Sequence, residues 1–221
     1  MVHRARWIYP TLVSALVALY WLAPSTHPYV VGAMGLVSLL GIRYGIVTYR
    51  PTRANAWRLI ALAIVVAAAG EISYDLFATG GATNAFPSMT DDLFLATYPP
   101  LAVGLLWLGL PRSPARDKAA MIDTAALSLA ASLIVWVALI SPTVSSLHLT
   151  GVAKAVAVAG WVGDSVVLAA TIRLASSWPK ATAALMLATA MVVLVTADIL
   201  YGVALIHGTW HSGGPIDILL L

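Results

Sequence analysis

Acidic and aromatic residues stand at helical spacing inside several apolar stretches of this sequence. Glu71, Tyr74 and Asp75 are spaced by three and four residues, so one helix face would carry all three. Asp198 and Tyr201 would share a face in the same way. A charge deep in a bilayer costs at least ~2.5–3.5 kcal/mol. We therefore expect these side chains to face a protein interior or water, and to be paired or protonated.

A further acid, Asp164, stands near the centre of another apolar stretch. Together these residues predict a polar pocket between the third, fourth, sixth and seventh helices, open to the outer face. It would hold a cation, a hydrogen-bonding ligand, a metal ion or a proton. The alternative is that the carboxyl groups are protonated and serve only as structural hydrogen-bonding groups beside the tyrosines. The residues predicted to line the pocket are Glu71, Tyr74, Asp75, Tyr98, Trp161, Asp164, Asp198 and Tyr201.

The sequence predicts neither a resident metal nor an organic cofactor. His207 and His211 have a spacing that would suit a metal ion on a helix, but the neighbouring Gly213-Gly214 favours a loop. Asp91 and Asp92 are typical of a helix N-terminus, where carboxylates complement the helix dipole. Phosphate-binding, dinucleotide-binding, hydrolase-elbow and zinc-protease motifs are absent. We therefore expect no enzyme activity from this chain on its own.

The composition is that of a multi-pass membrane protein. Of the 221 residues, 61% are hydrophobic and 10% are charged, and the mean hydropathy is +0.91. Cysteine is absent, which excludes disulfides and thiolate metal sites. The formal net charge of +3 does not indicate nucleic-acid binding, because the basic residues fall in short connections beside apolar segments, where they set topology.

Seven apolar segments are long enough to cross a hydrocarbon core of roughly 30 Å as helices. An eighth begins at Pro215, with Asp217 in its first turn, and stops at Leu221. We therefore expect an all-α transmembrane bundle, residues 1–221, that forms a membrane module separated from a cytoplasmic domain outside this chain. The predicted helices are 7–23, 30–49, 57–79, 92–110, 119–141, 152–175 and 181–206.

The positions of Lys and Arg predict the orientation. Nearly all of them lie in or beside four connections: 1–6, 50–58, 111–118 and 176–180. The alternate connections contain none: 24–29, 80–91, 142–151 and 207–214. Because Lys and Arg accumulate on the cytoplasmic side, this pattern predicts an inner-membrane protein with a cytoplasmic N-terminus.

A weak internal repeat also runs through the chain. Residues 71–74 match residues 198–201, and each match is followed by a Gly- and Pro-containing loop and then by an acidic residue that opens the next helix, at 92–95 and 217–220. The fifth and sixth helices would form a degenerate third copy. The repeat predicts a bundle built from helical hairpins whose tips point outward.

Several of these segments are similar to those of a known group of proteins. They are residues 116–118, 122–125, 136–142, 160–164, 197–201 and 207–217. Over residues 57–221 the chain resembles the N-terminal membrane regions of actinobacterial signalling proteins. In that group the membrane region precedes a cytoplasmic GGDEF diguanylate cyclase domain, often with an EAL phosphodiesterase domain. The resemblance implies a role in cyclic di-GMP signalling, and it implies no ligand for the membrane region.

The sequence therefore predicts a membrane sensory module that regulates a cytoplasmic output domain. Its expected partners are the lipid bilayer, an output domain or partner protein, and a small ligand or ion; a homodimer is compatible with this function. Two alternatives stay open. A small-molecule or ion transporter or channel would use Asp164 as part of a substrate or proton path. A membrane subunit without a ligand would use the acidic residues only structurally.

Overall fold

The computed structural model describes residues 2–23, 26–79, 86–110, 117–145, 150–178 and 182–206, and every regular element in these ranges is a helix. This confirms the predicted all-α class. The elements are α1 (Val2–Leu22), α2 (His27–Tyr49), α3 (Ala54–Thr79), α4 (Met89–Leu108), α5 (Asp117–Val135), the π-helical segment η3 (Trp136–Ile140), α6 (Ser141–Ser145), α7 (Gly151–Ser177) and α8 (Thr182–Ile206).

Five described segments are long and apolar enough to cross a membrane. Large apolar side chains such as Leu36, Leu129 and Ile134 are more than half exposed, as a lipid-facing surface requires. The helix α4 is not among the five, because two acidic residues and an internal pair of prolines lower its hydropathy. These features indicate a multi-pass membrane protein. The five segments are His27–Tyr49, Ala54–Tyr74, Ala125–Ser145, Gly151–Ser177 and Thr182–Ala204.

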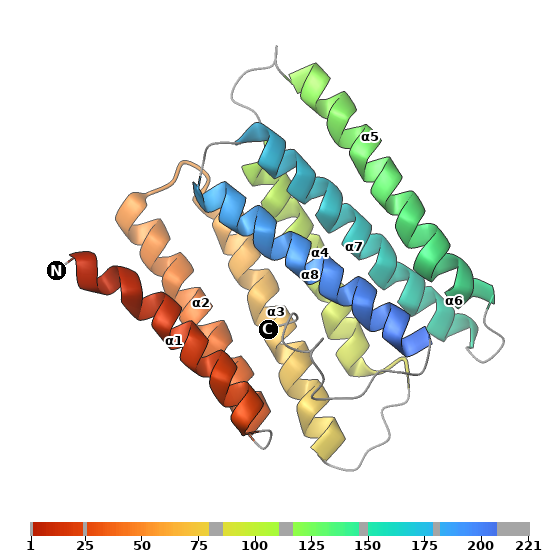
Figure 1. Cartoon of the computed structure of the whole chain (residues 1–221), viewed down its shortest axis with the longest axis horizontal. Coiled ribbons are helices and arrows are strands. Elements are labelled where there is room, and N and C mark those ends of the chain that lie inside the picture. Colours follow the sequence, from red (N-terminus) through yellow and green to blue (C-terminus); the bar gives the residue numbers. More distant parts are fainter. Residues whose placement is uncertain are drawn as a thin grey trace.

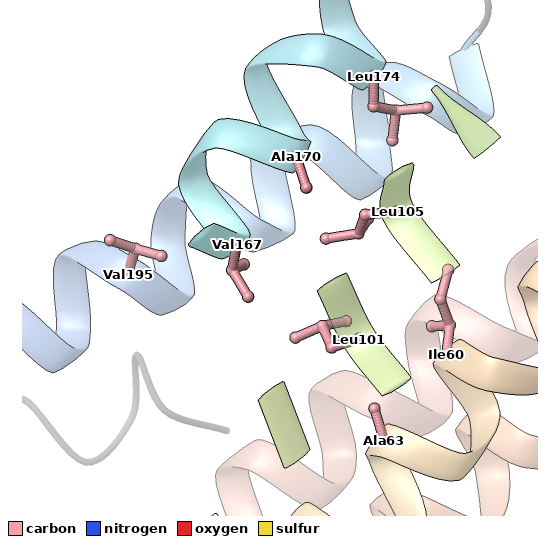
Figure 2. Close-up of a cluster of buried hydrophobic side chains, with 8 residues drawn as sticks. All are labelled: Ile60, Ala63, Leu101, Leu105, Val167, Ala170, Leu174 and Val195. Atoms are coloured by element: carbon pink, nitrogen blue, oxygen red, sulfur yellow. The ribbon is translucent and has the colours of Figure 1, made fainter. Parts of the chain in front are cut away.

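The helices α1 to α4 pack side by side in chain order, and the later helices pack beyond α4 (Figure 1). α1, α2, α3 and α4 follow one another, α7 packs on α4, and both α5 and α8 pack on α7. Side chains from α3, α4, α7 and α8 meet in the main core (Figure 2). α4 and α7 are therefore central helices, with neighbours on several sides. The core residues are Ile60, Ala63, Leu101, Leu105, Val167, Ala170, Leu174 and Val195.

The helix predicted over 119–141 does not end there. It continues from α5 through η3 and α6 to Ser145. Pro142 has no N–H to donate to the preceding turn. The N–H of Ser141 instead bonds to the carbonyl of Trp136, five residues earlier, which is the wider turn of a π-helix. The helix thus accommodates its proline through a change of winding.

The start of α4 lies three residues before the predicted one. Ser88 precedes the helix, and both its backbone N–H and its hydroxyl donate to Oδ2 of Asp91, at 2.6 and 2.8 Å. Asp91 and Asp92 lie in the first turn. The prediction that this acidic pair marks a helix N-terminus is confirmed.

Candidate functional site

A polar cluster joins three helices inside the bundle. The hydroxyl of Tyr98 on α4 donates to Oδ1 of Asp164 on α7 at 2.8 Å. The carboxyl group of Asp198 on α8 is a close neighbour of that of Asp164 and interacts with it. Asp164 is only 1% exposed, although it lies near the middle of an apolar helix. Three of the predicted pocket residues therefore meet, and their contacts link α4, α7 and α8.

The contact between the two carboxyl groups has a chemical consequence. An ionised carboxylate can only accept hydrogen bonds, so a bond between two carboxyls needs a proton on one of them. The Asp164–Asp198 pair can therefore share one proton, while the Tyr98 hydroxyl donates to the carboxyl of Asp164. A site of this kind can bind or release a proton, or can exchange the proton for a cation.

Two glycines allow aromatic rings to lie directly on helix backbones beside this cluster. A Cβ atom at position 163 would lie 2.6–2.7 Å from three carbon atoms of the Tyr98 ring. A Cβ atom at position 202 would collide with the ring of Trp161. Gly163 therefore lets the Tyr98 ring lie against α7, and Gly202 lets α8 approach Trp161.

Trp161 carries an unusual buried donor. Its Nε1 is buried and has no hydrogen-bond acceptor within the described part of the chain. The ring packs against the buried cluster of Val135, Leu139 and Ile140. A buried N–H without an acceptor is rare in folded proteins. Trp161 therefore has hydrogen-bonding capacity that a ligand or a water molecule could use.

The other predicted pocket residues lie on α3 and near the end of α8. Glu71 and Tyr74 are half-buried on α3, Tyr201 is half-buried on α8, and all three have interaction partners. α3 packs mainly on α2 and α4, and Figure 1 shows its far end diverging from α8. The side chain of Asp75 lies outside the described residues, as do His207, His211 and Asp217 with the predicted start of an eighth helix.

Sequence reasoning did not identify the backbone features around the cluster. Gly163 and Gly202 had no predicted role, although each stands within four residues of an acid and could have been noticed for that reason. Pro99 and Pro100 lie inside α4, directly after Tyr98. They remove two consecutive N–H groups from the helix ladder, so the helix is weakened next to the cluster.

The two clearest cavities among the described residues lie away from the cluster. Each has a volume of about 320 Å³. One lies between α5 and α7 near Ser132 and Ser165, and the other lies near the starts of α3 and α8 beside Arg53. Neither is lined by Tyr98, Asp164 or Asp198. An opening from the cluster to the outer face thus stays a prediction.

The described residues contain no group of three or more His, Cys, Asp or Glu side chains that could hold a metal ion. Comparison with known protein families, with curated proteins and with solved structures finds no match to this chain.

Proposed function

We propose that this chain is a membrane-embedded sensory module that regulates a cytoplasmic output domain or partner, such as a diguanylate cyclase. The observation that carries the proposal is the Tyr98–Asp164–Asp198 cluster, which cross-links α4, α7 and α8 through polar contacts in an apolar interior. A stimulus that removes the shared proton, or replaces it by a cation or a small ligand, changes these contacts. The helix packing shifts only if the stimulus binds one arrangement of the helices more tightly than the other.

The surroundings of the cluster support a movable contact. Pro99 and Pro100 weaken α4 beside Tyr98, and η3 supplies a wider turn against Trp161. The buried Nε1 of Trp161 offers a donor to a ligand that carries a hydrogen-bond acceptor. α8 carries Asp198 and packs on α7, so a change at the cluster acts directly on the position of α8.

We propose the finer topology as part of the same function. α1 and α4 have 21 and 20 residues, about 30 Å of helix each, and would cross the membrane together with the five apolar segments. The distribution of Lys and Arg supports a cytoplasmic N-terminus in the inner membrane. The packing of α3 on α4 and of α5 on α7 supports a construction from hairpins. The eighth helix would connect the module to its output domain.

The absence of cysteine allows a direct test with two introduced spin labels. We would place them at Tyr49, the last residue of α2, and Thr182, the first residue of α8, both of which are exposed. The distance between them would be measured by pulsed electron resonance in lipid nanodiscs while pH and cation concentration are varied. We expect a shift in the wild-type background and none in Asp198→Asn.

The exposed acid Asp92 provides the matched control, because Asp92→Asn removes a carboxylate at the start of α4 and away from the cluster. This variant should keep the wild-type response. An identical distance shift in Asp198→Asn would refute the role of the cluster as the sensing element.

A transporter or channel is the second candidate, because a protonatable pair inside a membrane is also typical of proton-coupled transport. The two functions differ in flux. Protein reconstituted into liposomes with a pH-sensitive dye inside should show no proton or cation flux above empty liposomes if it is a sensor. Flux that Asp164→Asn abolishes would favour the transporter over the sensor.

A further inference from the structure

The cavity near the starts of α3 and α8 combines one cationic side chain with a mainly apolar lining. It has a volume of about 320 Å³ and lies where the connection between α2 and α3 meets the ends of α4 and α7. Arg53 contributes the charged part of its lining, and the rest is mainly apolar and aromatic, including Trp57, Leu108, Trp178 and Leu187. The volume falls at the lower end of the roughly 300–1,000 Å³ that is common for small-ligand sites.

Arg53 is held in place by the end of α4. Its Nη1 donates to the carbonyls of Trp107, Leu108 and Leu110 at 2.9, 2.7 and 2.7 Å. These carbonyls belong to the last turn of α4 and the residues just after it, where the helix ladder ends, and the arginine adds to their hydrogen bonding. A guanidinium group has five N–H donors in a fixed fork. The bonds of Arg53 to described residues all use Nη1, so Nη2 and Nε keep donors for another acceptor.

The charge of Arg53 is only partly neutralised at this position. All of its acceptors are neutral carbonyls, and a helix C-terminus carries the equivalent of about half a negative charge. No carboxylate among the described residues forms an ion pair with it, so the cavity keeps a net positive field. An anionic group with several oxygen atoms would complete the guanidinium fork bidentately.

Two tryptophans line this cavity, which is typical of a site at the level of lipid headgroups. Trp178 donates its Nε1 to the carbonyl of Leu108 at 3.0 Å, and Trp57 lines the cavity from α3. Tryptophan is enriched at membrane–water interfaces, where one part of the ring is wet and the other is apolar. Apolar side chains of α8 continue the lining from this level into the bundle.

We propose that this cavity binds one anionic phospholipid, with the phosphate on Nη2 and Nε of Arg53 and an acyl chain along Trp57 and Leu187. A cation fixed at the mouth of an apolar cavity, between helices, at the end of the bundle that carries the Lys- and Arg-rich connections, matches a lipid with a charged head and an apolar tail. The lipid would join α3, α4, α7 and α8 at one end of the bundle.

The test uses the full chain, stripped of lipid in detergent and titrated with phosphatidylglycerol or phosphatidylcholine in native mass spectrometry. We expect one phosphatidylglycerol per chain to persist, and phosphatidylcholine to bind much more weakly. Arg53→Gln should weaken phosphatidylglycerol binding roughly tenfold or more, because a charge-assisted bond is lost. Arg58→Gln is the matched control, since Arg58 is exposed on the next turn and bonds only to Asn55 among described residues.

A second pair of variants tests the cavity without touching the arginine. Ala183 lines the cavity and is exposed, so Ala183→Trp should block lipid binding and leave the fold intact, whereas Ala190→Trp, exposed further along α8, should not. Soluble glycerol phosphate should fail to compete, because it lacks the acyl chain. Equal binding of the two lipids, equal effects of the two glutamine variants, or undiminished binding in Ala183→Trp would each overturn the proposal.

Discussion

At the scale of single residues, the polar cluster depends on a residue that has no side chain. Gly163 leaves the space in which the Tyr98 ring lies, and the ring position brings the hydroxyl to Asp164. The hydrogen bond of 2.8 Å and the close approach of α4 to α7 are thus two results of one small residue. Substitutions here should act through geometry as well as through lost contacts.

Gly163→Ala should destabilise the protein by about 1–3 kcal/mol, because the new methyl group meets a ring that is itself held by its hydroxyl. The chain contains a control on the same helix. Gly160 has nothing within 4 Å of its virtual Cβ, so Gly160→Ala should be neutral or stabilising by up to about 1 kcal/mol through helix propensity. Chemical unfolding in detergent, followed by circular dichroism, measures both. Equal behaviour of the two variants would contradict the packing argument.

Tyr98→Phe removes one hydroxyl and leaves the ring in place. Because the buried Asp164 then loses a donor, we expect a loss of about 1–3 kcal/mol in the free energy of unfolding. Tyr44→Phe is the comparison, since Tyr44 is 65% exposed on α2. Its effect should lie within about 0.5 kcal/mol of zero. A Tyr98→Phe protein as stable as the Tyr44→Phe protein would show that the hydrogen bond contributes little.

At the scale of elements, two departures from regular α-helix lie beside the cluster. The Pro99-Pro100 pair interrupts the ladder of α4 directly after Tyr98, and η3 packs on Trp161. Such departures often occur at functional positions, because they aim side chains that a regular helix would not. The residues of η3 also cover one side of the polar cluster, because Leu139 and Ile140 are buried against α7 and α8.

Leu139→Ala tests the contribution of this packing to stability. Leu139 is 0% exposed, so truncation should leave a cavity between η3, Trp161 and Gly202 and should cost about 2 kcal/mol. This is the low end for soluble proteins, because lipid is as apolar as the core and only the lost packing counts. Leu133→Ala, at a position that is 60% exposed on the same helix, should change stability very little. The comparison can be made by thermal unfolding of both variants in one detergent.

The helices were largely predictable from the sequence, but the side that each helix turns toward its neighbours was not. Apolar length alone placed the helices within a few residues, apart from the continuation past 141 that Pro142 and its π turn produce. The meeting of Tyr98 with Asp164 depends on how α4 and α7 rotate against each other, which Gly163 decides. The repeat predicted equivalent positions for Glu71 and Asp198. Their helices, α3 and α8, diverge in the structure, and the spacing of residues in a sequence does not encode the angle between two helices.

At the scale of the whole molecule, the predicted orientation puts the Arg53 end of the bundle in the cytoplasm. Single cysteines in this cysteine-free chain test it cleanly. An impermeant maleimide added outside intact cells should label a cysteine at the exposed Ser145 and spare one at the exposed Thr52. Permeabilised cells should label both, which controls for reactivity. Labelling at position 52 in intact cells would invert the topology and move the proposed lipid to the other leaflet.

The contacts of the cluster also suggest an order in which the helices associate during synthesis. During synthesis α4 is made first, then α7, then α8. Asp164 therefore arrives in lipid before Asp198 exists, and an unpaired acid there costs at least ~2.5–3.5 kcal/mol. Tyr98 is already present to receive it, so α4 and α7 can form a half-site on which α8 docks last. A ribosome that stalls before α8 would leave an intermediate in which α4 and α7 are joined by the tyrosine–aspartate bond and by their own packing, with Asp164 still without Asp198.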